Sequence, residues 1–186
     1  KKTKFIHIST DCVFTGKKGA YIEQDIPDEH SLYGRTKALG EVVDGKNLTF
    51  RTSIIGPEIK ENGIGLFHWF MKQKEEVKGF TKAIWAGVTT LELAKAVECA
   101  STTGLCGLYH LTNNESISKY ELLQLFQKYC KEDDIRIVPE DTLVCDKSIR
   151  CTRTDFAYQI PTYAVMIEKM AQWIKEHSDL YVGYKE

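Results

Sequence analysis

The sequence FIHISTD at residues 5–11 sets the fold that we expect for the whole chain. Its first part, Phe5 to Ser9, is short, apolar and rich in β-branched residues, which predicts a buried strand. The segment LTFRTSII at 48–55 has the same character and is closed by a Gly-Pro pair. Between these segments the composition of 32–43 favours a helix, so the order strand, helix, strand predicts a parallel crossover unit.

The composition limits the classes of protein to consider. The chain has 186 residues, 42% of them hydrophobic and 27% charged, and a formal net charge of −1. These values predict a soluble globular protein, and a nearly neutral chain gives no reason to expect nucleic acid or a membrane as partner. No apolar run approaches the ~20 residues that span a bilayer, so we expect a cytoplasmic location. The six cysteines form no C-x-x-C pair, which favours reduced thiols and no metal site.

The second half of the chain alternates helix and strand signals. Helices are predicted at 65–76 and 162–177, and strands at 107–112 and 135–138. Two capping boxes, Thr89 with Glu92 and Ser118 with Glu121, predict two further helix starts.

The spacing of Tyr33 and Lys37 in YGRTK indicates acid–base chemistry. Four residues apart on a helix, the two side chains share one face, with Cβ atoms roughly 5–6 Å apart. A free phenol is a poor acid–base group near neutral pH, and an adjacent ammonium favours its phenolate form. Such a phenol can exchange a proton with a substrate oxygen, while the ammonium can also bind a ribose diol. The same spacing arises by chance on solvated helices, so the pair needs supporting residues.

Ser9, Thr10 and Asp11 provide that support. They follow the first predicted strand, at the edge where doubly wound sheets bind ligands. A hydroxyl there can polarise a carbonyl that Tyr33 protonates, although Thr10 and Asp11 can also be simple turn or cap residues. The succession of strand, hydroxyl, glycine-containing loop, tyrosine–lysine helix and strand favours a catalytic site.

The stretch ISTDCVFTGKKGAYIEQDIPDEHSLYGRTKALGE at 8–41 resembles the extended short-chain dehydrogenase/reductase superfamily. Within it, the chain is most similar to the dTDP-4-dehydrorhamnose reductase-like group of nucleotide-sugar enzymes. That group carries S-T-D-x-V-F-x-G, G-x-Y-x-E-x-D and Y-G-x-[ST]-K-x-x-G-E, which match 9–16, 19–25 and 33–41 here. RTSIIG, GVTTLELAKAV and TRTDFAYQIPTYAVMIEKMAQWI also resemble the group, so the likeness covers nearly the whole chain.

This resemblance implies a role for each matching position. Thr10 would hydrogen-bond the sugar carbonyl, Tyr33 would donate the proton, and Lys37 would favour the phenolate and hold the nicotinamide ribose of NAD or NADP. The backbone of four successive residues would lie along the nicotinamide, namely Ile54, Ile55, Gly56 and Pro57. These assignments define a catalytic set of Thr10, Tyr33 and Lys37.

The resemblance also implies a pocket for the sugar nucleotide. Thr10, Asp11 and Trp85 would contact the substrate, within a pocket shaped by 63–69 and 82–88. For Trp85 a stacking role and a packing role are equal alternatives. Cys12 stands where the rhamnose reductases usually have Tyr, and Ile54 where they often have Trp, so the particular sugar is left open. Three charged residues are interpreted as loop or surface charges, namely Glu23, Asp25 and Arg35.

The family's N-terminal cofactor motif has no counterpart in this sequence. Its members begin with a strand, a Gly-rich phosphate-binding turn and a helix, and no G-x-x-G-x-x-G occurs here. We therefore expect the C-terminal part of a doubly wound (Rossmann-like) parallel sheet with a small mixed α/β substrate lobe. Residues 1–60 would form the C-terminal half of the NAD(P)-binding domain. Residues 61–186 would mainly form the substrate lobe, with a strand near 107–112 returning to the sheet.

The predicted reaction of the complete enzyme is hydride transfer between NAD(P)H and a 4-keto, or similar, nucleotide-hexose. The present chain alone is expected to be inactive, the partner is a nucleotide-sugar substrate, and a homodimer is allowed. An epimerase or dehydratase of the same superfamily would use the same three residues. A regulatory subunit of this group would bind a nucleotide and a partner enzyme without turnover, so both alternatives stay open.

Overall fold

A three-stranded parallel sheet organises the first half of the chain in the computed structural model, which describes residues 3–60 and 62–184. Its strands are β1 (Ile6–Thr10), β2 (Leu48–Thr52) and β7 (Gly107–His110), in the order β1-β2-β7. Thr10 pairs with Thr52, so β1 and β2 end at the same edge of the sheet. The predicted α/β class with a parallel sheet is confirmed.

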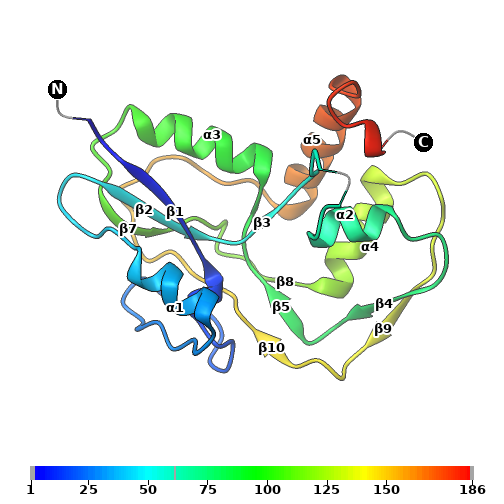
Figure 1. Cartoon of the computed structure of the whole chain (residues 1–186), viewed down its shortest axis with the longest axis horizontal. Coiled ribbons are helices and arrows are strands. Elements are labelled where there is room, and N and C mark those ends of the chain that lie inside the picture. The colour runs from blue at the N-terminus through cyan, green and yellow to red at the C-terminus, as the bar shows by residue number, and fades with distance from the viewer. Residues whose placement is uncertain (1–2, 61, 185–186) are drawn as a thin grey trace.

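Helices cover both faces of this sheet (Figure 1). In that view α1 (Leu32–Leu39) lies below the strands and α3 (Thr90–Ser101) lies above them. Leu48 and Phe50 of β2 are fully buried in the main hydrophobic core, which also includes residues of α3. The alternate residues of β2 are polar and turn towards the α1 side, where Thr49 Oγ1 donates to the Val42 carbonyl at 2.7 Å. The sheet thus has one apolar face and one polar face.

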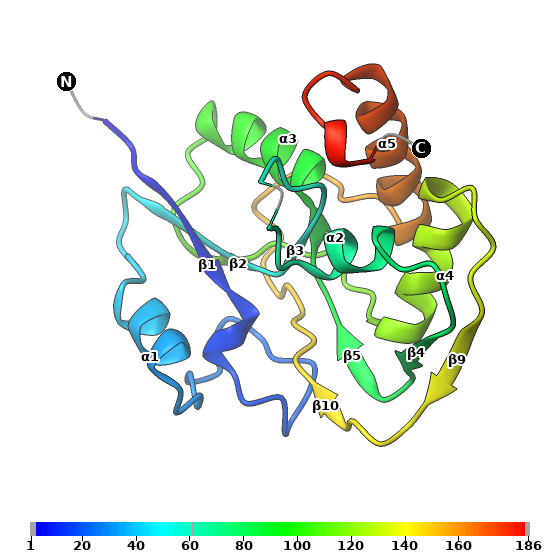
Figure 2. The same ribbon diagram turned by 45° about the vertical axis from the view of Figure 1, so that its right-hand side comes forward.

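Most of the residues after Ile55 form a mixed lobe beside the sheet. Its elements are α2 (Leu66–Met71), β4 (Val77–Phe80), β5 (Ala83–Trp85), β8 (Ile117–Ser118), α4 (Lys119–Cys130), β9 (Ile137–Glu140), β10 (Cys145–Asp146), α5 (Tyr163–Glu176) and η2 (Val182–Tyr184). Strand β4 pairs with β9, and β10, β5 and β8 form a second three-stranded sheet. Figure 2 shows these elements together on the side of the molecule away from β1.

One hydrophobic core joins the sheet to this lobe. Phe50 of β2, Phe67 and Phe70 of α2, and Phe126 of α4 are each at most 1% exposed and belong to the same cluster. The rings of Phe67 and Phe126 meet edge to face, with centroids 5.1 Å apart. Burying a side chain of this size stabilises the fold by about 1.5–3 kcal/mol, so the core holds the two parts together.

The predicted strand over 48–55 is wrong as a single element, because the chain changes sheet at Ser53. Strand β2 ends at Thr52, and β3 (Ile54–Ile55) pairs instead with β6 (Val88–Thr89). The cause is a close approach by Gly87, where an added Cβ would lie 2.1 Å from the Ser53 carbonyl oxygen. The Val88 N–H donates to that same oxygen at 2.9 Å, which turns the backbone out of the first sheet.

Two predicted helices end earlier than the sequence pattern suggested. The helix expected over 32–43 ends at Leu39. The Glu41 side chain beyond it accepts a hydrogen bond from Arg51 of β2, and the backbone there is not helical. The helix expected over 65–76 stops at Met71 and is followed by turns that lead into β4. Composition favoured helix in both tails, and tertiary contacts overrode that preference.

The two predicted capping boxes have different outcomes. At Ser118 the box is complete, since the hydroxyl accepts from the Glu121 N–H and the Glu121 carboxylate accepts from the Ser118 N–H. At Thr89 only the first half forms, with the hydroxyl accepting from the Glu92 N–H at 3.2 Å. The Glu92 carboxylate is used elsewhere, because the Tyr158 hydroxyl donates to it at 2.5 Å.

A buried ion pair crosses the polar face of the first sheet. Arg51 of β2 donates through Nε and Nη2 to the two carboxylate oxygens of Glu41, at 2.7 and 2.6 Å. The two side chains are only 4% and 6% exposed, respectively. The Ser9 hydroxyl of β1 adds a third bond to the same carboxylate at 2.7 Å, and the guanidinium lies over the Phe14 ring. This network ties β1, β2 and the segment after α1 to one another.

Replacing Arg51 tests how much this network contributes to stability. Arg51→Met leaves the Glu41 carboxylate buried without its cation, and we expect a loss of about 3–5 kcal/mol in the free energy of unfolding. Arg136→Met is the matched control, because Arg136 pairs with Glu76 at the surface and the expected loss is about 0–1 kcal/mol. Urea titration of both variants measures the difference. A loss below about 1 kcal/mol for Arg51→Met contradicts this description of the network.

Candidate active site

Thr10 and Asp11 lie where β1 ends and the short 3-10 helix η1 (Asp11–Val13) begins. The Thr10 hydroxyl accepts from the Cys12 N–H at 3.1 Å and donates to the Asp11 carboxylate at 3.1 Å. Thr10 is 9% exposed and Asp11 only 4%. The side chains thus form a small polar cluster at the carboxyl edge of the parallel sheet, the edge at which doubly wound folds bind ligands.

The Asp11 carboxyl is held among polar groups from several parts of the chain. Burial raises its pKa, and the Thr10 hydroxyl, the Lys147 ammonium, the Cys12 thiol and the Ser53 hydroxyl each oppose that rise. Burial and the Asp11 charge also raise the pKa of the Cys12 thiol, so the thiol stays protonated at neutral pH. Neutral Cys12 can therefore fill space or donate weakly beside a ligand, and it is not a reactive thiolate.

Trp85 is connected to this cluster by a hydrogen bond to Ser53. The Trp85 indole is 7% exposed, packs in the main core, and donates from Nε1 to the Ser53 hydroxyl at 2.8 Å. The Ser53 hydroxyl in turn lies close enough to Asp11 to lower its pKa. Trp85 thus contacts the cluster indirectly, and its role as a stacking surface for the substrate stays a prediction.

Tyr33 and Lys37 lie on α1, whose start is next to η1. The Tyr33 side chain is 58% exposed, which leaves its phenol accessible to a ligand. The Lys37 ammonium donates to the Ile8 carbonyl oxygen of β1 at 2.9 Å, so it lies against the strand that leads to Thr10. The structure therefore brings both ends of the predicted catalytic set to one region, while the roles themselves stay predictions.

Gly34 sets how closely α1 approaches this region. A Cβ added at Gly34 would lie 2.3 Å from Glu29 Cγ and 2.5 Å from the Cys12 carbonyl oxygen. Both contacts are too short for any side chain. The glycine between Tyr33 and Lys37 is therefore required for the helix to pack against η1.

The four residues predicted to lie along a nicotinamide follow directly after Ser53. Ile54 is 50% exposed and Ile55 is 6% exposed, so one face of β3 is apolar and open. Gly56 permits a tight contact with α3, since an added Cβ would meet Thr90 Oγ1 at 2.2 Å. An open apolar strand has the character that a planar nicotinamide ring requires.

Three other kinds of feature could carry function in the part of the chain that the structure describes: a cavity, a metal-ion site and a membrane-spanning helix. A cavity of about 690 Å³ lies between α2, α4 and α5; Phe67 of the predicted pocket segment 63–69 lines it, but none of the predicted catalytic or cofactor residues does. Across 3–60 and 62–184, no group of three or more His, Cys, Asp or Glu is placed to hold a metal ion. Within the same residues, no helix has the length and apolar content to cross a membrane.

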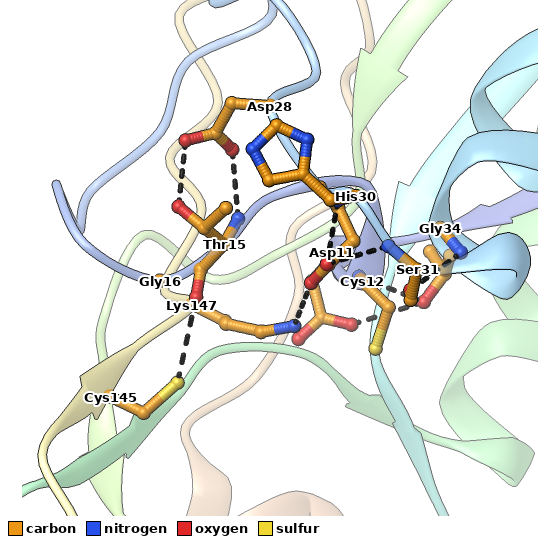
Figure 3. Close-up of polar contacts among 12 residues, drawn as sticks. Asp11, Cys12, Thr15, Gly16, Asp28, His30, Ser31, Gly34, Cys145 and Lys147 are labelled. Carbon is orange, nitrogen blue, oxygen red and sulfur yellow. Dashed lines mark hydrogen bonds and ion pairs between the residues drawn. The ribbon is translucent and has the colours of Figure 1, made fainter.

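The sequence interpretation missed three residues that complete the cluster. Ser53 comes directly after β2, just as Thr10 is the last residue of β1. Doubly wound sheets bind ligands at the carboxyl ends of their strands, so the argument that selected Thr10 also applies to Ser53. Glu29 and Lys147 form an ion pair at 3.2 Å beside Asp11, and no local pattern marks either of them (Figure 3). Glu23 is predicted to be a loop or surface charge; it lies in a loop, but it is not at the surface, because its buried carboxylate accepts from the His110 and Thr152 N–H groups.

The chain belongs to the RmlD substrate binding domain family, which matches residues 1–174. It is 35% identical over 123 residues to a dTDP-4-dehydrorhamnose reductase from Burkholderia thailandensis, an overlap of 59% of this chain and 41% of that protein. It is also 28% identical over 138 residues to methionine adenosyltransferase 2 subunit beta from Bos taurus, an overlap of 63% of this chain and 39% of that protein. The chain thus spans about two fifths of the length of these relatives.

A solved structure shows the same fold. The dTDP-4-dehydrorhamnose reductase from Bacillus anthracis, crystallised with NADP, superposes with a TM-score of 0.74 at 22% identity. The overlap covers 93% of this chain and 66% of that one. The likeness confirms the predicted Rossmann-like class, and the family match confirms the predicted resemblance.

The close contact at Gly34 leads to a prediction about stability. Gly34→Ala should destabilise the chain by about 1–3 kcal/mol through overpacking against η1, although alanine favours helices by ~1 kcal/mol. Gly40→Ala is the matched control at the other end of α1, where an added Cβ has its nearest neighbours at 3.4 and 3.6 Å. Urea unfolding of both variants measures the effect. If the Gly34→Ala variant is as stable as the original protein, α1 does not pack this closely against η1.

Proposed function

We propose that the full-length protein is an NAD(P)-dependent reductase of a keto nucleotide-sugar, of the dTDP-4-dehydrorhamnose reductase kind. The observation that supports this most is the arrangement of Thr10, Tyr33 and Lys37. Three features support it: a hydroxyl at the end of β1, an exposed phenol on α1, and an ammonium on the same helix that donates to a carbonyl of β1. The family match over residues 1–174 supports the same conclusion.

The cofactor would supply the hydride, and the residues of this chain would supply position and the proton. Tyr33 and Lys37 would contact the nicotinamide ribose, and Ile54, Ile55, Gly56 and Pro57 would lie along the ring. The exposed side chain of Ile54 supports this role, because it offers apolar surface to a ring. We assign only the nicotinamide end of the cofactor to this chain, and NAD and NADP are both candidates.

The substrate would be oriented by the polar cluster at the end of β1. The Thr10 hydroxyl would donate to the keto oxygen, and Asp11 would accept a hydrogen bond from a neighbouring sugar hydroxyl. Tyr33 would donate its hydroxyl proton to the keto oxygen, which would become an alcohol when the cofactor supplies the hydride to the carbonyl carbon. The Lys37 ammonium would stabilise the resulting phenolate until solvent returns the proton.

The two parts of the fold would share this work. Residues 1–60 would belong to the cofactor-binding domain and carry the catalytic helix, whereas 61–186 would mainly bind the nucleotide-sugar. The pairing of β7 with β2 supports the return of one strand from the second part to the sheet. Trp85 would support Asp11 through Ser53, as well as or instead of stacking on the substrate.

Regulatory binding without turnover is the second candidate function. The likeness to methionine adenosyltransferase 2 subunit beta favours it, because that relative is named as a subunit of a different enzyme. The presence of Thr10, Tyr33 and Lys37 together favours the reductase. Tight binding of a nucleotide by the full-length protein, with no consumption of reduced cofactor on any keto nucleotide-sugar, would establish the regulatory function instead.

Tyr33→Phe in the full-length protein tests the reductase proposal. Removing the proton donor should lower turnover about 10²–10⁴-fold, the usual contribution of general acid catalysis, and leave binding of the nucleotide-sugar nearly unchanged. Tyr120→Phe on α4 is the matched control, because its hydroxyl accepts from Gln124 at the surface. Turnover follows from the loss of reduced-nicotinamide absorbance, and binding from calorimetry. Turnover by Tyr33→Phe within a few-fold of the original protein rules out Tyr33 as the donor.

A further inference from the structure

The segment around Lys147 packs closely against two glycines of the loop that follows η1. Gly16 and Gly19 both have positive φ, +82° and +72°. A Cβ at Gly16 would lie 2.9 Å from Lys147 Cγ, and one at Gly19 would lie 2.3 Å from Asp146 Oδ2. The Asp146 N–H donates to the Gly16 carbonyl at 2.9 Å, which fixes the strand before Lys147. The two glycines noted in the sequence therefore make room for the segment around Lys147.

The Lys147 ammonium binds the residue that holds the start of α1. It donates to Glu29 Oε2 at 3.2 Å, and both side chains are mostly buried. The other carboxylate oxygen, Oε1, accepts from the His30 and Ser31 N–H groups at 2.8 and 3.0 Å. These bonds lower the pKa of Glu29 to about 2, with the backbone N–H groups as the main cause. Lys147 is thereby linked through Glu29 to the helix that carries Tyr33.

Lys147 also faces the buried Asp11 (Figure 3). The groups that act on the Asp11 carboxyl are the Thr10 and Ser53 hydroxyls, the Cys12 thiol and the Lys147 ammonium. Lys147 supplies the positive charge in this set. Burial alone would favour a neutral carboxyl, so the ammonium opposes protonation of Asp11 from a distant part of the chain.

We propose that Lys147 is a positioning residue for the reductase reaction, because its ammonium pairs with Glu29 at the start of the Tyr33 helix and places a positive charge on the side of the Asp11 carboxylate. The inference rests on the proposed function and extends it to a residue outside the predicted catalytic set. An ionised Asp11 accepts a hydrogen bond from a sugar hydroxyl, whereas a protonated one donates or turns away. Lys147 would thus control both substrate orientation and the place of the proton donor.

The pH profile of the full-length enzyme tests this role. Without Lys147 the pKa of Asp11 should rise, so Asp11 becomes protonated at a higher pH and the acidic limb of kcat/KM moves upward. We expect Lys147→Met to move this limb to higher pH and to lower kcat/KM several-fold on the acidic side. Lys147→Arg keeps the charge and should restore most of the profile, which loss of packing alone would not do.

Lys78→Met is the matched control, because Lys78 forms a surface ion pair with Glu140 on β4 and β9. Lys78→Met should leave the pH dependence of kcat/KM unchanged. An unmoved acidic limb in Lys147→Met, with kcat/KM within about twofold of the original protein, overturns the proposal. The proposal is equally overturned if Lys147→Arg is as impaired as Lys147→Met.

A stability measurement separates failure of this proposal from failure of the proposed function. Lys147→Met should lower the urea midpoint of the full-length protein clearly, but much less in a Glu29→Gln background, because the ion pair is already absent there. This difference should shrink as pH falls from about 4.5 towards 2, where Glu29 becomes protonated. Equal losses in both backgrounds overturn the proposal whether or not turnover is found. If the loss depends on Glu29 but the full-length protein turns over no keto nucleotide-sugar, the proposed function is rejected and the positioning role with it.

Discussion

The buried ion pair between Arg51 and Glu41 is the constraint on which the position of α1 at the candidate site depends. Helix α1 has little apolar packing of its own, since Leu32 and Leu39 are more than 80% exposed and Gly34 is its buried residue. An amphipathic helix normally gains its stability from a buried apolar face. Here polar contacts at the two ends take that role. Arg51 holds the segment after the helix, and Glu29 with the Ser31 cap holds its start.

These contacts explain why the site residues meet although they come from distant parts of the sequence. The register of β1 against β2 brings Thr10 level with Thr52, so Asp11 and Ser53 follow at one edge. The turn at Ser53 then exposes Ile54 beside that edge and leaves the Ser53 hydroxyl to Trp85. Parallel strand pairing therefore assembles the region, and the polar network keeps α1 against it.

Much of this arrangement could be predicted from the sequence, because its signals are local. The strand near 5–10, the α1 start and the box at Ser118 follow from periodicity and capping residues. The break at Ser53 could not be predicted, since its cause is Gly87, which lies far along the chain. Lys147 was missed for the same reason, because its ion pair with Glu29 spans more than a hundred residues.

The transfer of hydride to the sugar is the central chemical claim, and isotope labelling measures it directly. The full-length protein would be incubated with a keto nucleotide-sugar and with NADH or NADPH that carries deuterium on the carbon that donates the hydride. The mass of the sugar product would then be measured by mass spectrometry. We predict a sugar alcohol carrying one deuterium at the former carbonyl carbon. A sugar that is recovered without deuterium, or one that is epimerised or dehydrated instead of reduced, would contradict hydride transfer by this protein.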